Sequence, residues 1–109
     1  MITDSDMEKA VDFLRSEAGN AAKAKAEKEY LDSYSKVIKA QIQRENTLEG
    51  IGAQEARAYA DQRYATHLNG LKVAIEQDEF YRWKRAAAEA LIEAWRSQQA
   101  NERALGKVV

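Results

Sequence analysis

A run of about fifty residues, from Ala53 to Ala104, contains no proline and only one plausible helix interruption, at Asn69-Gly70. Most residues of this run favour the helical state. The run therefore predicts a single helix, which would extend about 75 Å at 1.5 Å per residue. A helix of that length does not fit a compact monomer of 109 residues. Whether it breaks at Gly70 stays open at this stage.

A short N-terminal helix is predicted over residues 4–18. Apolar residues recur there at helical spacing, and Asp4, Ser5 or Asp6 could cap its first turn. Gly19 then favours a break or a bend before the next helical segment.

The next segment, residues 20–45, has strong helix propensity and precedes the clearest turn, residues 46–52, which holds two of the five glycines. With the long helix over 53–104, these segments predict an all-α fold. We expect one helical domain over residues 1–109, built as a long antiparallel hairpin with the short N-terminal helix.

Alanine supplies much of the apolar content, so the core volume is modest. Hydrophobic residues make up 45% of the chain, but twenty of them are alanine. A large β-sandwich or a doubly wound α/β fold is therefore poorly supported. On the long helix, a seven-residue frame from Ala60 to Gln99 is apolar at both ends and polar in the middle, with Leu68, Ile75 and Leu91 beside it. This pattern is typical of a broad helix face that packs against several neighbours.

A hairpin alone would leave the large side chains of these stripes partly exposed to water. The sequence therefore predicts that the chain dimerises and completes a four-helix or larger bundle. Residues 1–55 carry eight cations and eleven anions, and residues 56–109 carry nine cations and seven anions, so antiparallel packing would offset the difference. We expect seven side chains in the core or at an interface: Leu31, Tyr34, Ile38, Tyr64, Leu71, Ile92 and Trp95.

The residue types that several kinds of chemistry require are missing or badly spaced. Without cysteine, the chain has no disulfide, zinc–thiolate site or cysteine nucleophile. The only histidine, His67, has no acidic residue three or four positions away, so a metal site is not expected. Glu89 and Glu93 share a helix face, but Arg85 and Arg96 are spaced to pair with them in solvent. The prediction is a non-enzymatic protein without a cofactor.

No apolar run approaches the roughly 20 residues of a membrane span. The acidic first residues also lack the pattern of a secretory signal. We therefore expect a cytoplasmic protein that does not enter a membrane.

Three aromatic residues and three cations occur within the segment Phe80–Arg85. Such interleaving can bind single-stranded nucleic acid, with cations on phosphates and rings on bases. Helical spacing divides these residues among several faces, however, and ordinary ion pairs to Asp78 and Glu89 are equally possible. Nucleic acid is therefore possible but not favoured, and we expect Trp83 to be more exposed than Trp95. The candidate contacts are Arg82, Lys84, Arg85 and Arg96, with Arg103 as a further one.

A combination of short blocks resembles small helical proteins of unassigned biochemical role that tailed bacteriophages and prophages encode. The blocks are Ala26–Leu31 with Tyr34, Lys39-Ala40, Tyr59–Asp61 with Tyr64, His67-Leu68, Gly70-Leu71, Ile92–Ser97 and Ala100–Ala104. The resemblance spans roughly residues 22–104, and Ile92–Ser97 is its most specific part. It implies a phage origin and work in the bacterial host cytoplasm, and it transfers no catalytic residue.

Two functions are consistent with these observations. The first is a non-enzymatic oligomeric helical protein that binds another phage or host protein through an exposed helix face. The alternative is an accessory factor in phage DNA replication or recombination that contacts single-stranded DNA. A small assembly chaperone is a third, weaker possibility.

Overall fold

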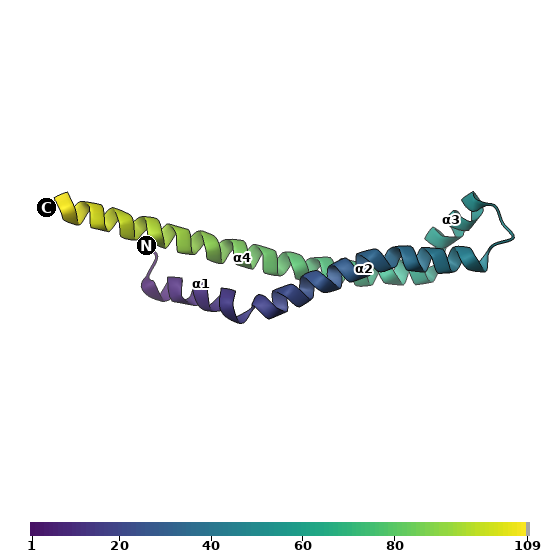
Figure 1. Ribbon diagram of the computed structural model, residues 1–109, viewed down its shortest axis with the longest axis horizontal. Helices are drawn as coiled ribbons and strands as arrows, with labels where there is room; N and C mark the ends of the chain where they lie inside the picture. Colours follow the sequence, from purple (N-terminus) through teal and green to yellow (C-terminus); the bar gives the residue numbers. More distant parts are fainter. Residues whose placement is uncertain (109) are drawn as a thin grey trace. The chain divides into compact units, whose positions relative to one another are not determined.

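The structure, a computed structural model, describes residues 1–108. Over these residues the chain forms helices and no strand, which confirms the all-α prediction (Figure 1). Contacts divide the chain into two compact units. Unit 1 contains Met1–Ala22 and the chain from Phe80 onward, and unit 2 contains Lys23–Glu79. The helices are α1 Asp4–Ser16, α2 Ala18–Glu45, α3 Ile51–Ala60 and α4 Gln62–Val108.

The first helix has a different cap from the three residues expected. The N-cap is Thr3, whose hydroxyl accepts the backbone N–H of Asp6, while the Asp6 carboxylate accepts the N–H of Thr3. The break after α1 lies at Glu17 and not at Gly19. Glu17 closes α1 through its N–H, while its carbonyl accepts the N–H of Ala21 in α2. Both helix boundaries at this junction therefore lie earlier in the sequence than predicted.

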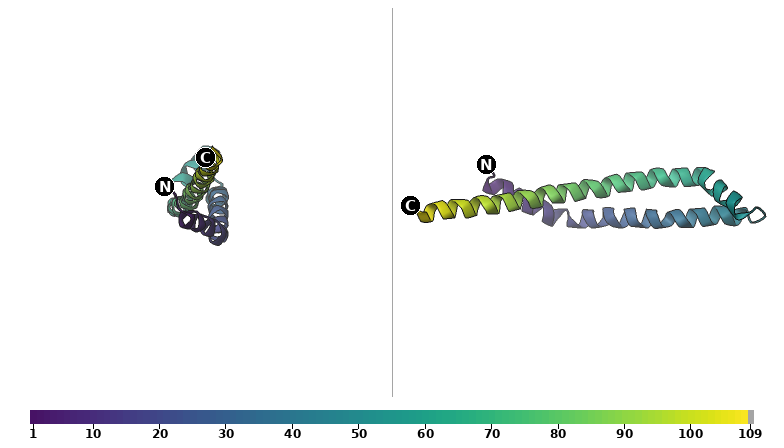
Figure 2. Two further views of the ribbon diagram at one scale, coloured as in Figure 1. Left: turned by 90° about the vertical axis from the view of Figure 1, so that its left-hand side faces the viewer. Right: turned by 90° about the horizontal axis from the view of Figure 1, so that it is seen from above.

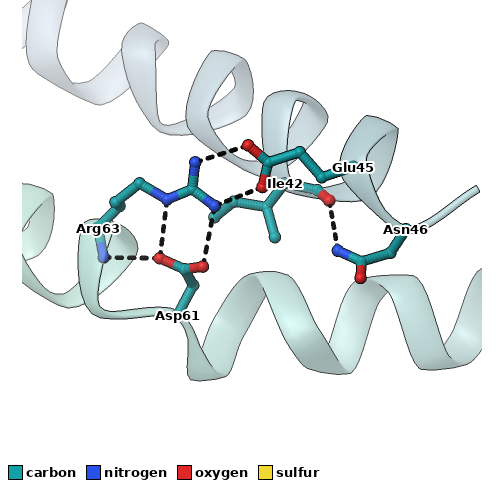
Figure 3. A network of polar contacts seen from close by, with 5 residues as sticks. All are labelled: Ile42, Glu45, Asn46, Asp61 and Arg63. Carbon is teal, nitrogen blue, oxygen red and sulfur yellow. Dashed lines mark hydrogen bonds and ion pairs between the residues drawn. The ribbon is translucent and has the colours of Figure 1, made fainter.

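The single helix predicted over residues 53–104 is wrong, because the chain is interrupted at Asp61. Asp61 is extended, with φ −73° and ψ 138°, and its carboxylate accepts the backbone N–H of Arg63 at 2.8 Å. This is the hydrogen bond of a helix N-cap, so Asp61 ends α3 and starts α4. Figure 3 shows the Arg63 guanidinium between the carboxylates of Asp61 and Glu45.

After this break, α4 continues through Gly70 without interruption. The open question about Gly70 is thereby answered, and no described glycine has a positive φ. The turn is also shorter than predicted, since only residues 46–50 separate α2 from α3. Asn46 stabilises the end of α2, because its side-chain amide donates to the Ile42 carbonyl at 2.8 Å.

In unit 2, α2 and α4 lie antiparallel (Figure 2). They meet along a seam of residues spaced alternately by three and four. Ile42, at 1% exposure, is the one large side chain fully buried among the described residues. The seam residues of α2 are Ala24, Lys28, Leu31, Ser35, Ile38 and Ile42, and those of α4 are Tyr64, His67, Leu71, Ala74 and Asp78.

The seam residues of α4 follow the predicted seven-residue frame, but the strip of buried residues along the seam is narrow. Leu68 and Ile75, expected to widen it, remain 43% and 42% exposed. The predicted core or interface residues are half-buried in every case: Leu31, Tyr34, Ile38, Tyr64, Leu71, Ile92 and Trp95.

In unit 1, α1 lies antiparallel to the second half of α4. Ala10 and Ala88 are buried between them, and polar contacts fasten the end of the pair. The Trp95 indole N–H donates to the Asp4 carboxylate at 3.0 Å. The Gln98 amide donates to the Ile2 carbonyl at 2.8 Å and accepts the Ile2 N–H at 3.3 Å.

Candidate interaction surfaces

One contact in unit 2 has the distance of a nucleophile–base pair. The Ser35 hydroxyl lies 2.8 Å from Nε2 of His67, and the Tyr34 ring centre lies 6.0 Å from the imidazole centre. His67 is 9% exposed, and Ser35 also donates, at 3.4 Å, to the Leu31 carbonyl of its own helix. A catalytic pair needs a third group that orients the base and donors for an oxyanion. The contacts here describe a histidine packed into a helical seam.

A second polar contact crosses the same seam. The Lys28 ammonium donates to the Asp78 carboxylate at 3.0 Å, and Asp78 is 3% exposed. The sequence frame placed Asp78 in the seam but suggested Arg82 as its partner, and it did not single out Lys28. The pair could not be found from the sequence because its members come from different helices. The part of the chain that the structure describes holds no group of three or more possible metal ligands.

The turn between α2 and α3 is held by polar contacts and presents apolar side chains. Arg57 donates to the Glu49 carboxylate at 2.6 Å, which lowers the pKa of Glu49. Gln54 donates to the Glu49 carbonyl at 2.8 Å. Leu48 and Ile51 are 102% and 80% exposed. The sequence indicated a turn here but not these exposed aliphatic residues.

The basic segment of α4 lies on the surface of unit 1. Arg85 pairs with Glu89 at 4.0 Å and Arg96 with Glu93 at 3.7 Å, which confirms the spacing argument. Arg82 and Lys84 are exposed as well, and the Lys84 ammonium lies 5.7 Å from the Phe80 ring centre. The candidate nucleic-acid contacts are therefore on the surface, and Arg85 and Arg96 form ion pairs there.

Large and small apolar residues form a stripe along one flank of α4 in unit 1, beside its seam. Trp83 is 72% exposed, whereas Trp95 is half-buried, which confirms the predicted order of the two tryptophans. Phe80 is 51% exposed. We call these residues the outer stripe of α4: Phe80, Trp83, Ala87, Ala90 and Ala94.

Comparison with protein-family models, curated proteins and solved structures finds no match to the chain. Among the described residues, no helix offers the long apolar stretch that crossing a membrane requires.

Proposed function

We propose that this chain is a non-enzymatic, oligomeric helical protein that acts by binding another protein through the outer stripe of α4. The exposure of Trp83, at 72%, carries this proposal. Burial of a large apolar side chain contributes about 1.5–3 kcal/mol, so a chain that leaves Trp83 and Phe80 in water gains most when a partner covers them.

The spacing of the outer stripe fits a partner helix. Its residues recur every three or four positions, which is how one helix presents anchors to another. Ala87, Ala90 and Ala94 allow close approach beside the two aromatic anchors. Given the resemblance to phage and prophage proteins, we expect the partner to be a phage or host protein of the bacterial cytoplasm.

A photoreactive phenylalanine analogue at position 83 tests this function in infected or induced cells. We expect one discrete crosslinked partner, identified by mass spectrometry. The control is the same analogue at position 89, where Glu89 is exposed on another side of α4. No adduct from position 83, or the same adducts from both positions, would contradict the proposal.

Single-stranded DNA is the second candidate ligand, because the exposed Trp83 ring lies between Arg82 and Lys84 in the sequence. An exposed ring can stack on a base while adjacent cations contact phosphates. The triple variant Arg82→Ala, Lys84→Ala, Arg85→Ala should then lose binding to labelled poly(dT), and the parent should bind less as salt rises.

A triple variant of Lys23, Lys25 and Lys36 to alanine controls for the loss of positive charge. Failure of the parent to retain poly(dT) at low salt would remove this candidate. An equal loss in both triple variants would mean that the charge, and not the Trp83 segment, is responsible.

A further inference from the structure

One side of unit 2 carries no charged side chain in its central part. It consists of the residues that immediately precede a seam residue, and in an antiparallel helix pair these positions lie on the same side of both helices. The contact between Tyr34 of α2 and His67 of α4 agrees with this placement. We call it the uncharged face: Tyr30, Tyr34, Val37 and Gln41 of α2, with Thr66, Gly70, Val73 and Gln77 of α4.

The opposite side of the same unit consists of the residues that immediately follow a seam residue, and it is rich in charge. Since 32% of the whole chain is charged, the uncharged face departs from the composition of its surroundings. Depletion of charge together with exposed tyrosine is the composition of an interface core. The charged residues of the opposite side are Lys25, Glu29, Asp32, Lys36, Lys39, Lys72 and Glu79.

Apolar side chains on the uncharged face are exposed, and two tyrosine rings of this face stack on each other. Tyr30, Val37 and Val73 are 61%, 43% and 65% exposed. The Tyr30 and Tyr34 rings stack with centres 5.8 Å apart and planes 24° from parallel. A preformed aromatic stack loses little conformational entropy when a second surface covers it.

Gly70 has no structural role within the chain. A glycine inside a helix is destabilising relative to alanine, and α4 neither breaks nor turns there. A Cβ at position 70 would meet nothing within 4 Å. Close approach of a helix from outside the chain is what a glycine on this face permits.

The face is complementary to itself in an antiparallel arrangement. A two-fold axis between Tyr34 and Val37 sets Tyr34 of one copy against Val37 of the other. The same axis brings Glu27, which bounds the face at one end of α2, opposite Arg44 at the other end. On this geometry we propose that a second copy of the chain covers the uncharged face and forms a four-helix bundle.

The same axis can be placed on α4. Because Ser35 lies opposite His67, the axis passes α4 close to Thr66, so a small residue lies where the two α4 helices meet. From Glu27 to Arg44 the face is about 25 Å long and two helices, or about 20 Å, wide. Its footprint of roughly 500 Å² per copy, or about 1,000 Å² in total, reaches the smallest size expected of a specific interface.

This dimer deepens the oligomeric part of the proposed function, but it uses different residues. The uncharged face lies in unit 2 and the outer stripe in unit 1. A monomeric parent that still gives a discrete adduct from position 83 overturns the dimer alone. A dimeric parent without that adduct overturns the docking proposal alone.

Single substitutions at two equally exposed residues distinguish the uncharged face from the opposite side of unit 2. Val37 and Leu68 are both 43% exposed, but they lie on opposite sides of unit 2. We expect Val37→Glu to raise the dimer dissociation constant at least about 100-fold, since it puts like charges near the axis. Leu68→Glu should leave the dimer intact. Sedimentation equilibrium measures both, with circular dichroism to verify helicity.

Charge reversal tests the register of the dimer. Glu27→Arg sets arginine against Arg44 of the other copy, and Arg44→Glu sets glutamate against Glu27, so each variant alone should weaken the dimer about tenfold at low salt. Mixing the two variants should restore it as a heterodimer, because both end pairs are again opposite in charge. A monomeric parent at about 100 µM, dimer loss in Leu68→Glu but not Val37→Glu, or no recovery on mixing would overturn the proposal.

Discussion

At the scale of single residues, Asp78 and Lys28 form an unequal pair. The Asp78 side chain is 5% exposed and that of Lys28 is 30% exposed. The lysine head can therefore reach water if its partner is removed, whereas the carboxylate cannot. A buried charge that loses its partner retains the full cost of its desolvation.

We expect Lys28→Met to lower the free energy of unfolding by about 1–3 kcal/mol, and Asp78→Leu to lower it by less. The double variant should be close to the parent, because replacing both partners by apolar groups leaves no unpaired charge. Urea denaturation of the four proteins measures this cycle. A cost for Asp78→Leu equal to or above that for Lys28→Met would contradict the assignment of Asp78 as the enclosed partner.

At the scale of helices, the period of the apolar residues could be predicted, and so could the start of α1 and the end of α2, but the other helix ends could not. The frame of α4 was correct because burial selects residues at fixed spacing, so Tyr64, Leu71 and Trp95 all point inward. The break at Asp61 was missed because neither proline nor glycine makes it. The sequence signal for this break is an aspartate that can cap the next helix. That signal competes with the high helix propensity of the residues on both sides.

The two candidate surfaces also differ in how far the sequence could predict them. The exposure of Trp83 follows from its place outside the frame, which one helix alone determines. The uncharged face depends on which side of α2 meets which side of α4, so Tyr34 could be assigned only to a core or interface. The pattern of a single helix did not indicate that its neighbours Tyr30 and Val37 belong to the same face.

The junction of α3 and α4 should be sensitive to acid. Hydrogen bonds from Arg63 lower the pKa of both Glu45 and Asp61. Because the folded pKa values lie below the unfolded ones, this stabilisation is complete above the unfolded values and is lost as pH falls through the folded values. In Arg63→Gln we expect both pKa values to rise, Asp61 less fully since it still accepts a backbone N–H.

Carboxyl carbon chemical shifts followed by NMR against pH measure this effect. Asp6 is the internal control, because Thr3 and not Arg63 lowers its pKa. Unchanged titration of Glu45 in the variant would show that the contact with Arg63 does not persist in solution.

The attachment of α1 should depend on Trp95. The ring is half-buried and its N–H donates to Asp4 at 3.0 Å. For Trp95→Ala we expect the free energy of local opening of α1 to fall by about 2–3 kcal/mol, less than for a fully buried ring. Hydrogen exchange should show lost protection in α1 and unchanged protection in unit 2. Trp83→Ala should leave α1 protected, and unchanged α1 exchange in Trp95→Ala would contradict the assignment.

At the scale of the whole molecule, little apolar volume is enclosed by the chain itself. Ile42 is the one large side chain fully buried among the described residues, and the other buried apolar residues of the core are alanines. A core of this kind contributes little stability for its length, because alanine removes a small apolar area from water. Stability should therefore come in part from association, which obeys mass action.

We expect the thermal midpoint of the parent to rise by several degrees between about 1 and 100 µM protein, since dilution favours the separated chains. Circular dichroism at 222 nm follows the transition across this range of concentration. Val37→Glu should melt at a midpoint independent of concentration, and near that of the most dilute parent, because its uncharged face cannot be covered. Leu68→Glu should keep the parent's concentration dependence. A parent midpoint that does not change with concentration would mean that the narrow seams stabilise the chain without a second copy.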